Sequence, residues 1–265
     1  MATRDIIVIG ASAGGVQALS TLVADLDPNL PAAVFIVLHL SANVPSLLPD
    51  ILARESKLEV AHAVDGEPIK RGRVYVAPPD QHLIIEEGSV RLVHGPKENL
   101  HRPSIDALFR SAARWAGPRL IGVVLTGARD DGKVGMRAVQ QRGGITIVQD
   151  PSEAPFPSMP MSVMQEIKVD YSLPLREVAP LLNTLSREVA GEEGRYPVPD
   201  DVEIESRIAE QNMESAELIA SVEQLGRVSF EKRAREAEKH STMIRQVLLS
   251  GEKGGIGELV LQNKE

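Results

Sequence analysis

Three polar residues of the kinds that carry acyl-transfer chemistry each follow a predicted buried strand: Ser12, His39 and Asp131. In a hydrolase triad, a serine hydroxyl attacks a carbonyl carbon, a histidine takes up and returns the proton, and a carboxylate orients the imidazole. Such triads occur in several chain orders on unrelated folds, so the order Ser, His, Asp excludes nothing. The residue types therefore predict a serine hydrolase, with Ser12 Oγ within hydrogen-bond reach of His39 Nε2.

The three residues can meet only if neighbouring strands carry them. Continuous apolar runs, typical of fully buried strands, predict these strands at Ile6 to Ile9, Ala32 to Leu40 and Leu120 to Leu125. Helical spacing of apolar residues over Val16 to Asp25 joins the first two strands into a βαβ unit. Adjacent parallel strands end at the same edge of a sheet, so we expect Ser12 and His39 to lie close together there.

The same residues allow other readings. The run from Gly10 to Gly15, GASAGG, also matches the dinucleotide-binding pattern GxGxxG with a serine at its second glycine. His39 stands where that pattern requires an acidic residue. Ser12 can also be a helix N-cap, as can one of the adjacent Asp130 and Asp131 before the next helix. From the residues alone we favour the hydrolase over the nucleotide binder, and both alternatives stay open.

Composition narrows the class of protein. The chain has 265 residues, 43% of them hydrophobic but only 3% aromatic, so its core must consist of aliphatic side chains, which suits a helix-covered parallel sheet. Cysteine is absent, which excludes disulfides, thiol nucleophiles and thiolate metal sites. No apolar run is long enough to span a bilayer, and no signal peptide precedes the first strand, so we expect a cytoplasmic protein. The net charge of −8 provides no basic surface for nucleic acid.

The remaining elements continue the α/β pattern with one interruption. Helices are predicted at 44–55, 103–115 with Ser104 as N-cap, 134–142, 162–167 and 175–189, and strands at 57–64, 145–149 and 171–173. Short runs separated by tight turns at 73–77, 83–86 and 89–93 predict an antiparallel hairpin attached to one edge of the sheet.

A composition change near residue 190 predicts a domain boundary. We assign residues 1–190 to the main domain, the polar and proline-bearing 191–201 to a linker, and 202–265 to a tail. From Gly191 onward, ten Lys and Arg stand against sixteen Asp and Glu, so the acidity is concentrated there. We expect the tail to form one or two exposed helices or to order only on a partner.

Six runs of the sequence together resemble one known family. They are VIGASAGGVQAL, VLHL, VAPPDQHLII, HRPSIDALFRSAAR, GVVLTGARDDGKVGM and GGITIVQDPSEAPFPSMPMSV, in order within residues 4–189. They look like the catalytic domain of the CheB family of chemotaxis methylesterases, protein-glutamate methylesterases that are also glutamine deamidases. The resemblance implies a doubly wound, mostly parallel α/β sheet with a hairpin at one edge, with the charged helical extension outside the domain.

The resemblance also implies a site and a substrate. The family triad falls on Ser12, His39 and Asp131, and the family motif T-G-x-x-x-D-G at Thr126 to Gly132 selects Asp131 from the acidic doublet. The implied reaction is hydrolysis of glutamate γ-methyl esters on methylated receptors of the chemotaxis type. It needs no cofactor and no metal, and the implied partners are the cytoplasmic domains of those receptors and a separate regulator.

Three positions depart from the family pattern. Ala13 follows the nucleophile where the family usually has threonine, and Ala128 and Arg129 replace a Met-Gly pair in the aspartate loop. We assign Ala13, Gly14, Gly15, Ala128 and Arg129 to the oxyanion site and substrate rim. The departures predict altered substrate preference or lower activity. The alternative is a weak or inactive relative that binds receptors or other partners without turnover.

Control of this chain is expected to differ from that of many relatives. Their catalytic domain follows a phosphoacceptor receiver domain, whereas the first catalytic strand here starts near residue 5. We therefore expect no control by phosphorylation of an attached receiver.

Overall fold

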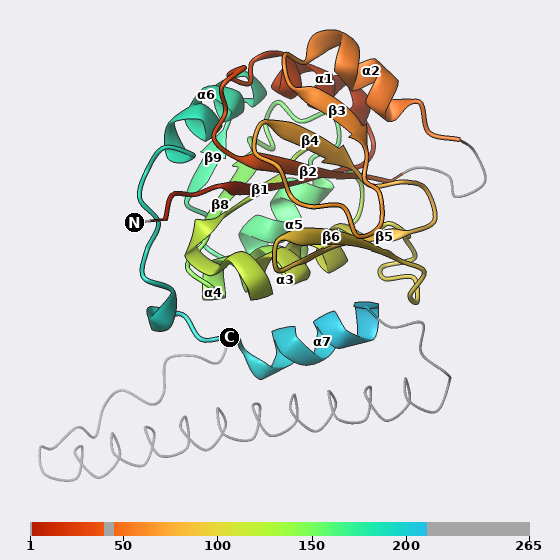
Figure 1. The fold of residues 1–265 in the computed structure, drawn as a ribbon. Helices are drawn as coiled ribbons and strands as arrows, with labels where there is room; N and C mark the ends of the chain where they lie inside the picture. Colours follow the sequence, from red (N-terminus) through yellow and green to blue (C-terminus); the bar gives the residue numbers. More distant parts are fainter. Residues whose placement is uncertain (1, 40–44, 211–265) are drawn as a thin grey trace, which may run out of the picture. The chain divides into compact units, whose positions relative to one another are not determined.

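The computed structural model describes residues 2–39 and 45–210. Within these ranges the chain alternates between strands and helices for most of its length (Figure 1). The helices are α1 (Gly15–Ala24), α2 (Leu48–Glu55), α3 (Ile105–Ala116), α4 (Lys133–Gln141), α5 (Ser158–Glu166), α6 (Leu175–Leu185) and α7 (Asp200–Glu210). The strands are β1 (Ile6–Ala11), β2 (Ala33–Leu38), β3 (Glu59–His62), β4 (Arg73–Val76), β5 (His82–Glu86), β6 (Ser89–Val93), β7 (Leu120–Val124), β8 (Ile145–Gln149) and β9 (Tyr171–Leu173).

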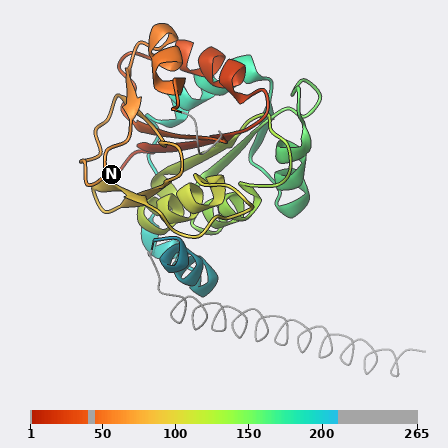
Figure 2. The same ribbon diagram turned by 90° about the vertical axis from the view of Figure 1, so that its right-hand side faces the viewer.

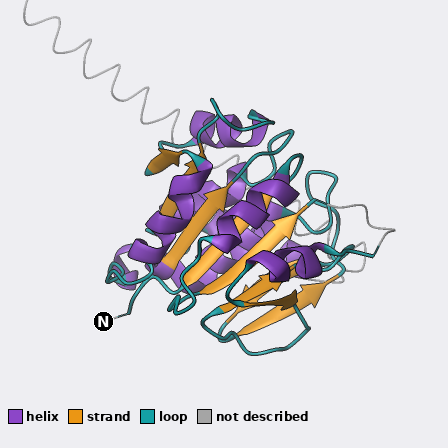
Figure 3. Cartoon of the chain, turned by 90° about the horizontal axis from the view of Figure 1, so that it is seen from above, coloured by secondary structure: helices purple, strands orange, loops and turns teal. Residues whose placement is uncertain are grey.

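Seven strands form one parallel sheet in the order β3-β4-β2-β1-β7-β8-β9. Figure 3 shows these strands running in a common direction. The chain builds outward from β1 to β2 and its neighbours, then crosses to the other side of β1 with β7. The winding direction therefore reverses between β1 and β7, and in such sheets ligands bind beyond the carboxyl ends of the strands at this point.

The sheet is covered on both faces (Figure 2). One layer, from α1, α2 and α6, packs on Ile7 and Ile9 of β1 and on the strand residues that point the same way. The opposite layer, from α3, α4, α5 and the β5–β6 pair, packs on Val8 and its counterparts. Both faces of β1 are thus fully buried, which explains why its sequence is continuously apolar rather than alternating. The predicted α/β class with a mostly parallel sheet is confirmed.

The strand pairing observed between residues 73 and 93 differs from the predicted hairpin in two respects. The segment at 73–77 joins the parallel sheet as β4, between β2 and β3. Only β5 and β6 form the antiparallel pair, and they make a separate two-stranded sheet that packs against α3 rather than extending the large sheet. Periodicity cannot separate the two cases, because short apolar strands pair in either direction and only their partners decide which.

The described part of the tail is helical and packed. Helix α7 starts at Asp200, inside the segment predicted as linker, and the 3-10 turn Glu193–Arg195 precedes it. Val202, Ser206 and Ala209 on α7 are buried, and Glu203 bonds to Arg114 of α3 at 2.6 and 3.0 Å. The predicted tail beyond residue 210 lies outside the described residues, as do residues 40–44. No helix among the described residues is both long and apolar enough to cross a membrane.

Candidate active site

The candidate nucleophile lies in a tight turn between β1 and α1. Ser12 directly follows β1, and Gly14 precedes the helix with φ of 75°, a conformation that favours glycine. The Ser12 N–H donates to the carbonyl of Thr126 (3.1 Å), and the Gly15 N–H donates to the Ser12 carbonyl (2.8 Å). The turn therefore uses the Gly15 amide internally. The N–H groups of Ala13 and Gly14 have no partner among the described residues, so they are the ones that can bind an oxyanion.

His39 connects the serine to a buried carboxylate. It follows β2, and its backbone N–H bonds to the Ala11 carbonyl at 3.2 Å, which places it beside the end of β1. Its Nδ1 lies 3.2 Å from Ser12 Oγ, and its Nε2 lies 2.7 Å from Asp131 Oδ2. The His39 and Asp131 side chains are only 5% and 1% exposed. The structure thus brings the three predicted residues together.

The orientation of the imidazole differs from our expectation. Nδ1, not Nε2, faces Ser12, because Asp131 reaches the ring from the α3 side and takes Nε2. Both ring nitrogens can serve as acceptor or donor, depending on the tautomer. With Asp131 accepting from Nε2–H, Nδ1 is left as the acceptor for the serine proton.

Asp131 is surrounded by hydrogen-bond donors. Besides His39, it accepts from the N–H groups of Ile105 (2.8 Å), Gly132 (3.0 Å) and Asp106 (3.1 Å), from Ser104 Oγ (3.0 Å) and from Asn99 Nδ2 (2.9 Å). Burial raises the pKa of Asp131, but the hydrogen bond and charge of His39 and the other donors outweigh it and hold the pKa below its usual range. The side chain is therefore an anion, suited to support an imidazolium on His39.

The first residues of α3 and its N-cap provide several of the hydrogen bonds that Asp131 accepts. Ser104 is the N-cap residue of α3, as predicted, but its hydroxyl bonds to Asp131 and makes no capping hydrogen bond to the helix. Asp131 itself accepts from the free N–H groups at the helix start, where a negative charge is favoured. Gly10 allows this approach, since a Cβ there would lie 2.4 Å from the Ile105 side chain.

His101 lies against the imidazole of His39, the candidate base. Its ring stacks on that of His39, with centroids 3.6 Å apart and planes 5° apart. Burial, and secondly the charge of His39, lower the pKa of His101, which favours a neutral ring. No sequence pattern indicates this contact, because it joins a loop and a strand end far apart in the chain.

Two of the three substituted rim positions are exposed. Ala128 and Arg129 lie in the loop after β7, and Arg129 has φ of 70°, a conformation rare for a side-chain-bearing residue. The Arg129 charge contributes to the lowered pKa of His101, which places this cation near the site. Asp130 is exposed and pairs with Lys133 at 3.3 Å, so only the second aspartate of the doublet faces His39.

The loop before α5 borders the turn that carries Ser12. This contact was not predicted from the sequence. Thr126 Oγ1 donates to the Ala13 carbonyl (3.1 Å) and accepts from the Phe156 N–H (3.0 Å). The Phe156 side chain, 45% exposed, lies beside Gly14. An apolar side chain therefore borders the turn that carries Ser12. No group of three or more His, Asp or Glu side chains that could hold a metal occurs among the described residues.

Comparisons with known proteins agree on one family. A family model described as CheB methylesterase matches residues 7–182. A "protein-glutamate methylesterase/protein-glutamine glutaminase 2" of Anaeromyxobacter dehalogenans is 39% identical over 183 residues, covering 69% of this chain and 54% of that protein. A Leptospira interrogans protein whose name gives the same two activities provisionally is also 39% identical, covering 68% of this chain and 94% of that protein.

A solved structure shows the same fold. The crystal structure of the Thermotoga maritima CheB methylesterase catalytic domain superposes with a TM-score of 0.66 at 36% sequence identity. The match covers 98% of that chain and 68% of this one. The chain spans about half the length of the Anaeromyxobacter relative, and its similarity to the Thermotoga structure is to a catalytic domain.

Proposed function

Because the chain belongs to the CheB methylesterase family, we propose that it hydrolyses glutamate γ-methyl esters on the cytoplasmic domains of methylated, chemotaxis-type receptors. The observation that carries the proposal is the continuous hydrogen-bonded series from Ser12 through His39 to the buried Asp131. We also propose deamidation of glutamine at the same site, since both reactions transfer an acyl group to water and differ only in the leaving group.

The proposed reaction has two halves. Ser12 Oγ attacks the ester carbonyl while its proton passes to His39 Nδ1, and the resulting imidazolium is stabilised by Asp131. Collapse of the tetrahedral intermediate breaks the bond to the methoxy group, which takes the proton from His39 and leaves as methanol. Water then attacks the acyl-enzyme with His39 as base, which releases the glutamate carboxylate and restores Ser12.

The backbone around Ser12 is suited to stabilise the oxyanion. We assign this role to the unpartnered N–H groups of Ala13 and Gly14, with the amide of Ala128 across the site. Such donors are effective because they are already in place when charge develops, and losing one typically costs about 100- to 1,000-fold in rate. Alanine at 13 and 128 retains these amides, so the proposed chemistry does not depend on the side chains that the family usually has there.

The test is methanol release from a methylated receptor fragment. We expect Ser12→Ala to abolish release, because it removes the hydroxyl that forms the acyl-enzyme, whereas Ser20→Ala in α1 serves as a control outside the site and leaves the rate unchanged. Unchanged release by Ser12→Ala would contradict the mechanism. A wild-type protein that binds the receptor fragment but releases no methanol would favour the alternative of a binding module.

A further inference from the structure

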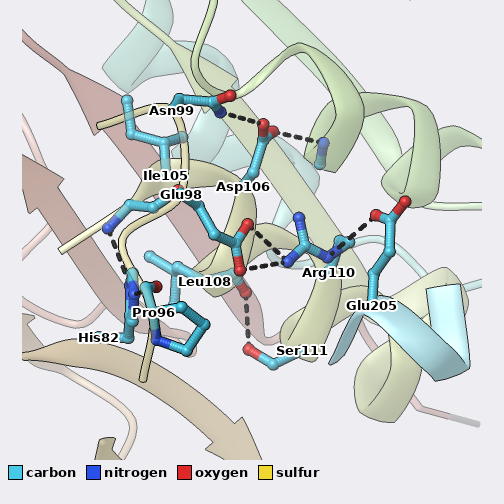
Figure 4. Close-up of polar contacts among 12 residues, drawn as sticks. His82, Pro96, Glu98, Asn99, Ile105, Asp106, Leu108, Arg110, Ser111 and Glu205 are labelled. Carbon is cyan, nitrogen blue, oxygen red and sulfur yellow. Dashed lines mark hydrogen bonds and ion pairs between the residues drawn. The ribbon is translucent and has the colours of Figure 1, made fainter. Parts of the chain in front are cut away.

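A second carboxyl group lies directly behind the candidate triad. Asp106, on the first turn of α3, is 2% exposed and has no part in the reaction described above. Its Oδ1 accepts from the Gly135 N–H at 2.6 Å, and its Oδ2 accepts from Asn99 Nδ2 at 2.8 Å (Figure 4). The same Asn99 nitrogen donates to Asp131 Oδ1 at 2.9 Å. One amide group therefore joins two carboxyl groups, one of which holds His39.

The position of Asn99 is strongly determined by its surroundings. Its backbone has φ of 49°, which asparagine adopts more readily than most residues. It follows Glu98, whose backbone exchanges hydrogen bonds with His101 (3.1 and 2.8 Å) and whose carboxylate accepts two bonds of 2.7 Å from Arg110 (Figure 4). Although Asn99 as a residue is exposed, its amide nitrogen points inward and closes the two carboxyl groups off from solvent.

The two carboxyl groups have opposite charge preferences. Burial, followed by the charge of Asp131, raises the pKa of Asp106 to about 8, and the nearby Arg110 cation does not offset this. Asp131 is held as an anion. A neutral amide with two N–H groups can bond to both at once, whereas an anion between them would repel Asp131 and a shorter side chain would reach neither.

We propose that Asn99 and Asp106 are positioning residues for the triad. Asp106 fixes the Asn99 amide, and the amide holds Oδ1 of Asp131 so that Oδ2 stays in line with His39 Nε2. This inference rests on the proposed hydrolase function but concerns how the triad is aligned rather than which ester it cleaves. The hydrogen bonds described for Asn99 and Asp106 reach Asp131 but neither His39 nor Ser12, so both residues act through Asp131.

The competing explanation is purely structural. On that view, the contact between Asn99 and Asp106 only fastens the loop that carries Asn99 to α3, and the bond from Asn99 to Asp131 contributes nothing to turnover. The two explanations differ in which of the two hydrogen bonds of Asn99 matters, so an exchange of the two residues can separate them.

The experiment compares Asn99→Asp, Asp106→Asn and the double variant that exchanges the residues. Asn99→Asp removes both donors without changing size, and Asp106→Asn sets an NH₂ group against either Asn99 or Gly135. The double variant restores a donor and an acceptor between positions 99 and 106, but leaves a carboxylate facing Asp131 Oδ1. We expect each single variant to lower kcat by about 10- to 100-fold with KM within about twofold. We expect the double variant to recover part of the melting temperature that the single variants lose, because the bond between positions 99 and 106 returns while the repulsion of Asp131 remains, but not to recover kcat.

Recovery of both kcat and melting temperature in the double variant would overturn the proposal in favour of the structural explanation. If the double variant does not fold, Asn99→Ala decides, because it removes the amide at an exposed residue without adding charge, and a wild-type kcat for it would equally overturn the proposal.

A second readout separates this inference from the proposed function. Labelling of Ser12 by a fluorophosphonate measures activation of the serine without any receptor, and Ser12→Ala is its blank. A wild-type protein that is labelled but releases no methanol would contradict the substrate assignment alone. A labelling rate that is unchanged in Asn99→Asp would contradict the positioning role alone.

Discussion

At the scale of single residues, the imidazole ring of His39, the candidate base, is contacted at both of its nitrogens and on one of its two faces. Ser12 and Asp131 take the two nitrogens of His39, and the His101 ring lies flat against it at 3.6 Å. A proton-transfer group must keep its direction while its charge changes, and contacts in the ring plane do not prevent the ring from tilting out of that plane. The stacked neutral ring of His101 supplies the missing restraint.

The stacking contact leads to a prediction about His101. His101→Phe retains a flat ring of similar size, so we expect kcat to stay within about threefold of wild type, whereas His101→Ala frees one face of His39 and lowers kcat by about tenfold. The measurement is steady-state methanol release for both variants. Equal losses in the two variants would show that the imidazole chemistry of His101, rather than its shape, is required.

At the scale of elements, α7 adds a buried face to α3 that contains one unsatisfied group. Ser206 is 2% exposed, and its hydroxyl has no hydrogen-bond partner in the described structure. A buried hydroxyl without a partner is destabilising, and serine is a poorer helix former than alanine. The contact between these helices is made by the apolar Val202 and Ala209 and by two ion pairs, Glu203 with Arg114 and Glu205 with Arg110.

We predict that Ser206→Ala stabilises the protein by about 1 kcal/mol in urea unfolding. The matched control is Ser111→Ala in α3, a serine that is 1% exposed but donates to the Leu108 carbonyl and accepts from the Ile85 N–H. Loss of these bonds should destabilise by about 1 to 3 kcal/mol, because the Ile85 amide is then left unpaired. Destabilisation by Ser206→Ala would mean that its hydroxyl has a partner.

At the scale of the whole molecule, the buried Asp106 couples global stability to pH. Its pKa is about 8 in the folded protein, against a reference value of 3.8. The folded state therefore holds a proton that the unfolded state releases, so the stability from this group is fully present below about pH 4 and is lost as pH rises to 8. Asp131 acts in the opposite direction, but only at pH values below its reference range, because its pKa is lowered.

The prediction is a difference in slope between wild type and Asp106→Asn. Between pH 5 and 7, the free energy of unfolding of the wild type should fall relative to the variant by about 1.4 kcal/mol per pH unit, since one proton is involved. Urea unfolding at pH 5, 6 and 7 measures it, and comparing slopes removes any constant cost of the substitution. Parallel curves would show that Asp106 is ionised in the folded protein throughout this range.

Much of the fold can be predicted from the pattern of apolar and polar residues within short stretches of the sequence. The continuous apolar runs of β1, β2 and β7 are short and rich in β-branched residues, which favours strands buried on both faces, and the chain returns between them through helices, so a parallel sheet is expected. The serine and histidine directly after β1 and β2, and the aspartate in the loop between β7 and α4, were recognisable by type and by motif. These features depend on short stretches of the sequence, so they can be predicted without knowing which distant segments pack together.

Other features depended on packing between distant segments. Whether β4 joins the large sheet or a hairpin is decided by which strand edges are free, and Ser104 bonds to Asp131 rather than to its own helix because Gly10 lets α3 approach β1. The imidazole orientation of His39, the stacking of His101 and the bridge from Asn99 to two carboxyl groups have the same origin. The sequence alone determined which chemical groups are present and which strands precede them in the chain. The tertiary structure decided which atoms face each other, because hydrogen bonds and stacking depend on distances between segments remote in the chain.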